Sequence, residues 1–150
     1  MAIARGAGTE IIRSIHLENV NDTARQLIYG AQHHVYTVLS IIVQCQGLNA
    51  ATDNIGVRLI GYDSVDGTTA QDIFLFNNLV LAVGETFVFN DKFSFNGHEP
   101  TDFTGPVDSV AKQDAIADQG SSVAQVLYAG ATHASDNYDI WVTFIDQNNE

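Results

Sequence analysis

A two-residue alternation of apolar and polar side chains runs through the chain and predicts β-strands. The longest such stretch is 35–46, and its β-branched residues favour a strand over the alternative of a helix. We expect one apolar face of this strand to point into the core, formed by Val35, Thr37, Leu39, Ile41, Val43 and Cys45. The opposite face is mixed and is expected to meet a second sheet or a partner, with Tyr36, Val38, Ser40, Ile42, Gln44 and Gln46.

Shorter runs of the same kind recur every 8 to 12 residues with turn residues between them. Asp66-Gly67 is the strongest hairpin signal. The further predicted strands are 11–17, 25–29, 55–62, 71–76, 79–81, 87–89, 93–95, 123–128 and 138–145. The pattern predicts an all-β fold, an antiparallel β-sandwich that is jelly-roll-like, with about eight to ten strands.

Two segments depart from this pattern. Residues 1–10 are small and Gly-rich at their start, and we interpret them as an N-terminal arm that is flexible or bound by a partner. Residues 97–113 hold both prolines and form one long loop, of a length that is often functional. Residues 114–117 fit the start of a short helix or a bent strand. We therefore expect a single β-sandwich domain over 11–150.

Composition adds an expectation about partners. Charged residues make up only 16% of the chain, below the roughly 25% usual for soluble domains, so we expect part of the surface to be covered in an oligomer or larger assembly. The net charge is −12, and the six Lys and Arg residues are scattered singly. This distribution argues against nucleic acid and against an anionic membrane surface as partners.

The single cysteine, Cys45, excludes an intrachain disulfide and is expected to be a buried, inert thiol. The first residues lack the apolar segment of a signal peptide, so we expect synthesis in a cytoplasm without export by the usual route.

Residues that could carry chemistry are present but do not form a recognisable motif. His33-His34 is interpreted as a surface pair at a strand entrance, because neighbours on a strand point to opposite faces. The potential metal ligands are His98, Glu99 and Asp102 in the long loop, and Asp63 and Asp66 with Asp53 or Asp72 near the hairpin; both sets lack a diagnostic spacing. No nucleophile elbow or phosphate loop occurs. The sequence thus predicts a protein that is not an enzyme and has no cofactor and no metal.

Six phenylalanines form three pairs at i and i+2, so the members of each pair are expected to share a face: Phe74 and Phe76, Phe87 and Phe89, Phe93 and Phe95. Core packing is the favoured interpretation. A sugar-stacking platform or a subunit interface is the alternative.

The strand order resembles that of small virion structural proteins of tailed bacteriophages. The resemblance covers about residues 35–145 and is carried by a long apolar strand at 35–43, the strand 57–63 with its hairpin 65–69, the apolar run with a glycine turn at 79–87, and the closing strand 138–144. The family pattern has a short turn where this chain has 97–113.

The resemblance implies a capsid decoration (cement) protein, or a neck or tail component. Decoration proteins of this kind are commonly homotrimers that bind the major capsid protein on the outer shell of a virion assembled in the host cytoplasm. The arm and the long loop are the expected contact elements, with the candidate interface residues Ile3, Arg5, Glu10, Glu99, Phe103 and Val107. One alternative is a carbohydrate- or receptor-binding sandwich, with Trp141 or Phe103 as the stacking residue. A small hydrolase is a further alternative, and the abundance of acidic residues is the only feature that supports it.

Overall fold

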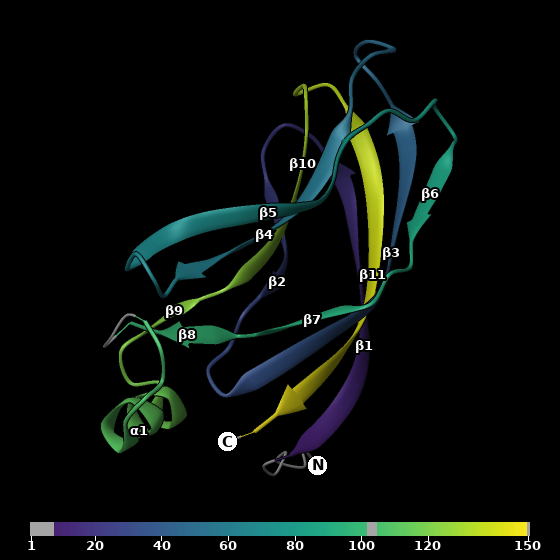
Figure 1. Cartoon of the computed structure of the whole chain (residues 1–150). Coiled ribbons are helices and arrows are strands. Elements are labelled where there is room, and N and C mark those ends of the chain that lie inside the picture. The colour runs from purple at the N-terminus through teal and green to yellow at the C-terminus, as the bar shows by residue number, and fades with distance from the viewer. Residues whose placement is uncertain (1–7, 102–104, 150) are drawn as a thin grey trace.

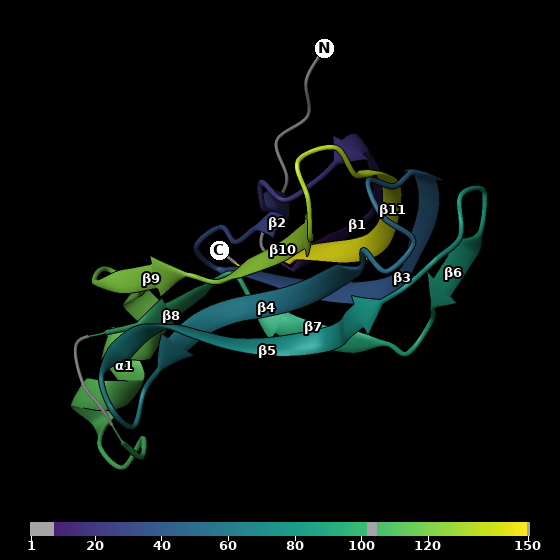
Figure 2. The ribbon, with the colours of Figure 1, turned by 90° about the horizontal axis from the view of Figure 1, so that it is seen from above.

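Two antiparallel sheets pack face to face in the computed structural model, which describes residues 8–101 and 105–149 (Figures 1 and 2). The first sheet has the order β1 (Thr9–Val20), β11 (Asn137–Asn148), β3 (His34–Gly47), and then β6 (Thr86–Phe89) and β7 (Phe93–Asn96), which both pair with β3. The second sheet has the order β2 (Arg25–Tyr29), β10 (Val126–Ala131), β4 (Ile55–Asp63) and β5 (Thr68–Leu79).

The chain crosses between the sheets in the manner of a jelly roll. The strands β1, β2, β3 and β4 alternate between the first and the second sheet. The later strands also alternate: β5 lies in the second sheet, β6 and β7 in the first, β10 in the second and β11 in the first. The last strand, β11, then lies between β1 and β3. The predicted all-β, jelly-roll-like sandwich is therefore confirmed.

An insert occupies residues 97–125, between β7 and β10. It contains β8 (His98–Pro100), α1 (Val110–Asp118) and β9 (Ser122–Ala124), and β8 pairs with β9 in a small sheet of its own. The prediction of a plain loop over 97–113 is corrected here, because the segment starts with a strand and leads into a helix. Ser109 caps that helix by accepting a hydrogen bond from the Lys112 backbone N–H at 3.3 Å.

The core fills the space between the sheets. Both inner faces supply aliphatic side chains, including Ile41, Val57, Leu127 and Val142, all fully buried. Aromatic rings extend this core along its length, with ring-centroid distances of 5.3 Å for Phe76–Phe87 and 5.4 Å for Tyr36–Phe95. Core packing thus accounts for five of the six phenylalanines, namely Phe76, Phe87, Phe89, Phe93 and Phe95.

The predicted inward face of 35–46 is correct only in its second half. Ile41, Val43 and Cys45 are buried, but at the start of β3 the buried residues are Tyr36 and Val38. The cause is a register shift against β11, between the pairs Thr143–Ser40 and Phe144–Val38. This β-bulge inserts one residue and so reverses the alternation of the faces.

A register shift also separates Phe74 from Phe76. Phe76 pairs with the buried Val57, whereas Phe74 pairs with Arg58 on the outer side. The two rings therefore do not share a face as predicted, because the intervening bulge at Leu75 changes the parity of β5.

Two predicted boundaries also change. The strand predicted at 79–81 does not form, since Leu79 ends β5 and residues 80–81 are irregular. Thr9 and Glu10, assigned to the arm, begin β1 and pair with Asn148 and Gln147, so the sheet starts earlier than predicted. Residues 1–7 lie outside the described part of the chain.

Tyr138 places a phenol in the core, where its Oη has no hydrogen-bond partner among the described residues. Burial raises the pKa of this phenol, with a smaller contribution from Cys45. We expect Tyr138→Phe to raise the free energy of unfolding by about 0.5–1.5 kcal/mol in urea denaturation, because it removes an unsatisfied buried hydroxyl.

Tyr36 is the matched control, because its Oη accepts a hydrogen bond from the Ala31 backbone N–H at 3.1 Å. Tyr36→Phe should lower the stability by a similar amount. Equal effects of the same sign in the two variants would contradict this account.

Candidate functional site

The outer face of the first sheet carries three rows of side chains without a formal charge. The strand register places His16, Trp141, Ile42 and Val88 in one row, Ser14, Thr143 and Ser40 in the next, and Ile12, Ile145, Thr37 and Ser94 in the third. We call these residues the uncharged face. Because the side chains of a strand alternate, each of them points away from the core residues beside it.

The lack of charge on this face contrasts with the rest of the chain, which has eighteen Asp and Glu residues. The first charged side chains on the same side are Glu10 at one end and Glu18 and Asp139 at the other. Between them Trp141 is 45% exposed, and its ring lies against the His16 ring at a centroid distance of 5.0 Å. An exposed aromatic on an uncharged sheet face is typical of a surface that another protein covers.

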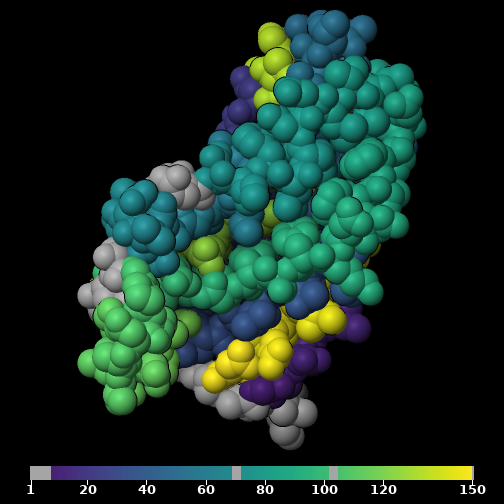
Figure 3. Space-filling view, in the orientation of Figure 1, coloured from purple at the N-terminus to yellow at the C-terminus, as the bar shows by residue number. Residues whose placement is uncertain are grey.

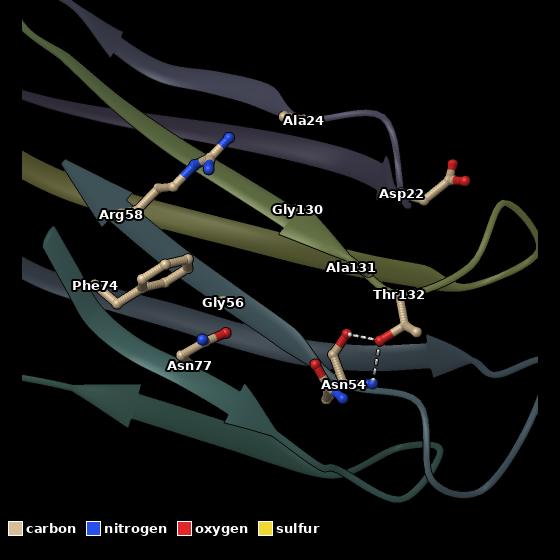
Figure 4. A pocket seen from close by; sticks show the side chains of 10 residues that line it. All are labelled: Asp22, Ala24, Asn54, Gly56, Arg58, Phe74, Asn77, Gly130, Ala131 and Thr132. Carbon is tan, nitrogen blue, oxygen red and sulfur yellow. Dashed lines mark hydrogen bonds between the residues drawn. The ribbon is translucent and has the colours of Figure 1, made fainter. Parts of the chain in front are cut away.

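The outer face of the second sheet carries a groove. Gly56 and Gly130 pair across β4 and β10 and leave a floor without side chains. In the neighbouring row on the same side, the larger side chains of Phe74 and Arg58 extend from β5 and β4 (Figure 4). Tyr128 of β10 pairs with Arg58 in the same row. The resulting groove has a volume of about 320 Å³ and is lined by Asp22, Ala24, Asn54, Gly56, Arg58, Phe74, Asn77, Gly130, Ala131 and Thr132.

Polar groups at the groove are held by local contacts. Arg58 Nη1 lies 3.2 Å from Asp72 Oδ2, and the Arg58 guanidinium lies 5.9 Å from the centroid of the Tyr128 ring. At the end of the groove the Thr132 hydroxyl bonds both the N–H and the carbonyl of Asn54, each at 3.0 Å. The Phe74 ring is 44% exposed beside the Gly56 floor, so an apolar wall faces polar side chains.

The insert stands out at one end of the molecule in the space-filling view (Figure 3). No residue of α1 is buried, and Val110 and Val107 are exposed. The helix has nine residues, and isolated helices shorter than about 12–15 residues are marginal in water. Helices in proteins usually gain stability by packing an apolar face. The helix of the insert thus lacks the buried apolar face that stabilises most helices in proteins.

The residues considered as potential metal ligands make ordinary protein contacts. Asp63 Oδ1 accepts hydrogen bonds from the N–H groups of Val65 and Asp66, which confirms the turn interpretation. His98 Nδ1 lies 2.9 Å from Ser122 Oγ, and burial lowers the pKa of this imidazole. The described residues contain no group of three His, Cys, Asp or Glu side chains arranged to hold a metal ion.

The remaining candidates take separate places. His34 Nδ1 lies 2.6 Å from the buried Asp146 carboxylate, whereas the neighbouring His33 adopts a positive φ of 62°. Cys45 is buried, as predicted, and burial raises the pKa of its thiol. Among the described residues, no helix is long and apolar enough to cross a membrane.

The predicted interface residues lie partly outside the described chain. Ile3, Arg5 and Phe103 are in the segments that the structure does not describe. Glu10 is exposed at the end of the uncharged face, Glu99 accepts a hydrogen bond from Asn96 Nδ2 at 3.0 Å, and Val107 is exposed beside α1. Their role in an interface stays a prediction.

Neither the uncharged face nor the groove on the second sheet, which we call the Phe74 groove, was predicted from the sequence. The charge-free outward positions of 12–16 and 141–145 were visible in the sequence. Their neighbourhood depends on the strand register, which the sequence alone does not provide.

No family profile and no curated protein matches the sequence. Similar solved structures include a chain of the Bacillus endospore appendages, which form disulfide-linked pili, with 14% identity and a TM-score of 0.40 over 100% of this chain and 97% of that chain. A chain of infectious bursal disease virus strain Gx has 8% identity and a TM-score of 0.47 over 97% of this chain. A chain of the VP2 subviral particle of that virus has 7% identity and a TM-score of 0.47 over 97% of this chain. This chain spans only 34% of each of these two viral chains.

Proposed function

We propose that this protein has a structural, non-enzymatic role in a virion and decorates the outer shell by binding the major capsid protein. The uncharged face carries this proposal. A chain with eighteen acidic residues leaves three successive rows of one sheet face without them, which suits adhesion to another protein surface. The acidic residues elsewhere keep the other surfaces soluble and mutually repelling.

The area of the uncharged face can be compared with the area that a stable interface buries. With strands about 4.8 Å apart and same-side residues about 6.8 Å apart, the three rows cover roughly 400 Å². A stable interface buries about 800 Å² on each partner. The uncharged face thus supplies about half of such an interface, and the exposed insert and the N-terminal arm are the proposed source of the rest.

Trp141→Lys tests the proposal in co-sedimentation with empty shells of the virus that encodes the chain. Tryptophan at the centre of an interface typically contributes 2 kcal/mol or more, so we expect binding to weaken by about thirtyfold or more. Phe74→Lys is the matched control, because Phe74 is 44% exposed against 45% for Trp141 but lies on the opposite sheet. Unchanged shell binding by the Trp141 variant would contradict the proposal.

The Phe74 groove favours a second candidate, a carbohydrate-binding component of a neck, tail or receptor-binding structure. A sugar ring presents apolar C–H faces and a rim of hydroxyls, which suit a Phe74 wall with Asn54, Asn77 and Arg58 around it. In this candidate function Phe74 is the proposed stacking residue, whereas Trp141 or Phe103 was named from the sequence.

The same two variants separate the candidates on a glycan array. The carbohydrate-binding function predicts glycan binding that Phe74→Lys abolishes and Trp141→Lys retains. Shell decoration predicts instead that Trp141→Lys weakens binding to particles and that Phe74→Lys does not. An array without binding by the wild-type protein would eliminate the second candidate.

A further inference from the structure

The edge strand β1 has an open side over most of its length. It pairs with β11 on one side, in continuous register from Thr9 to Leu17. On the other side no described strand pairs with it. Along an edge, every second residue turns its backbone N–H and C=O toward the solvent, where they can accept another strand. Ile11 and Ile12 are both exposed on this stretch.

The other edges of the two main sheets are protected. β2 has five residues, and the edge formed by β6 and β7 consists of two four-residue strands interrupted at 90–92. β5 is long, but its register against β4 shifts at three places. Short strands and bulges are the usual means of blocking edge pairing. Among the described strands of these sheets, only β1 is long, continuous and open.

We infer that two copies of this chain pair through β1, in antiparallel orientation about a two-fold axis. Among the described strands of the two main sheets, a second copy has no other long edge with continuous register, so β1 is expected to meet β1, and this makes a closed, isologous dimer. The dimer would join the two first sheets and bring two uncharged faces into one continuous surface. The inference does not rest on shell decoration.

Side-chain exposure and charge together favour one register of this pairing. Centring the axis on Ile12 places Ile12 opposite its own copy, Ile11 opposite Arg13, and Glu10 opposite Ser14. A shift of one residue toward the C-terminus would place Arg13 opposite Arg13, and a shift of two would place Glu10 opposite Glu18. Like charges directly opposite destabilise a sheet pair. Ile12 is also 73% exposed in the single chain, so its pairing removes much apolar surface.

The mass of the full-length protein in solution gives the first test. We expect a species of twice the chain mass of 16.3 kDa by light scattering, converted to the single chain by Ile12→Lys. Val65→Lys is the matched control, because Val65 is 74% exposed in the hairpin turn after β4 and should leave the dimer intact. A wild-type single chain or a three-fold species would overturn the inference.

Disulfide cross-linking tests the register. Directly opposed residues have Cβ atoms about 4.5–5.5 Å apart, so Ile12→Cys should give a covalent dimer on mild oxidation. Ser14→Cys should not, because in this register the two Ser14 residues are offset by four residues, about 14 Å. The native Cys45 is buried and should stay reduced. Cross-linking through Ser14, or through neither position, would overturn the proposed pairing.

Discussion

Replacing Gly97 by alanine should lower the free energy of unfolding by about 2–4 kcal/mol and the Tm by about 5–15 °C. A Cβ atom at Gly97 would lie 1.9 Å from the backbone oxygen of Ala31 and 2.7 Å from its nitrogen. Backbone atoms cannot rotate away as a flexible side chain can. The substitution must therefore separate the segments that meet where the insert leaves the sandwich.

The hydrogen bonds at this junction explain the size of the effect. The Gly97 N–H donates to His34 O at 2.7 Å, and the Gln125 N–H donates to Gly97 O at 2.8 Å. Gly97 thus joins the start of β3 to the two ends of the insert, and moving it would weaken both bonds.

Gly47→Ala is the control for the Gly97 variant. A Cβ atom at Gly47, within β3, would meet only Asn137 Cβ at 3.8 Å, which is ordinary contact, so little change is expected. Thermal unfolding of both variants measures the difference. Similar Tm values for the two would show that the close approach at Gly97 does not limit stability.

Local residue patterns were sufficient to predict most strands. The strand predicted over 25–29 has those bounds in β2, and 87–89 and 93–95 differ from β6 and β7 by one residue each. These runs are short and apolar between turn residues, so their limits depend on neighbours in the sequence. The Asp66-Gly67 hairpin formed for the same reason, with Gly67 at φ 69°.

The errors arose where structure depends on a distant partner. The bulges near Ser40 and Leu75 are properties of the pairing with β11 and β4, and nothing near them in the sequence marks the extra residue. They decide which face Tyr36 and Phe74 occupy. The helix alternative for 114–117 is confirmed by α1, but its start at Val110 was not predicted. None of its residues is buried, so its sequence lacks the apolar stripe of a packed helix.

The same distinction between local residue patterns and distant strand pairing applies to the candidate surfaces. Composition showed that the chain has few charges, and it predicted that a partner covers part of the surface. Which residues form the uncharged face was not, because His16, Trp141 and Val88 come together only through the pairing of β1, β11, β3 and β6. Residue chemistry thus predicts the kind of surface, and strand register fixes its location.

Asp136→Asn is expected to destabilise the opposite end of the sandwich by about 2–4 kcal/mol. The Asp136 carboxylate is buried and accepts hydrogen bonds from the N–H groups of Asn49 and His133, one at each oxygen and each at 2.9 Å. It therefore links the β3–β4 loop to the β10–β11 loop. An amide keeps one acceptor oxygen, while its NH₂ group would face the other N–H donor, so one charge-assisted bond becomes a contact between two donors.

Asp66→Asn is the control for Asp136, because Asp66 is exposed in the hairpin turn, where such a change should cost no more than about 0.5 kcal/mol. Urea unfolding at neutral pH compares the two variants. Hydrogen exchange should also show faster opening of the Asn49 and His133 amides in the Asp136 variant alone. Equal stability of the two variants would mean that the loops are held by their own turns and not by the shared carboxylate.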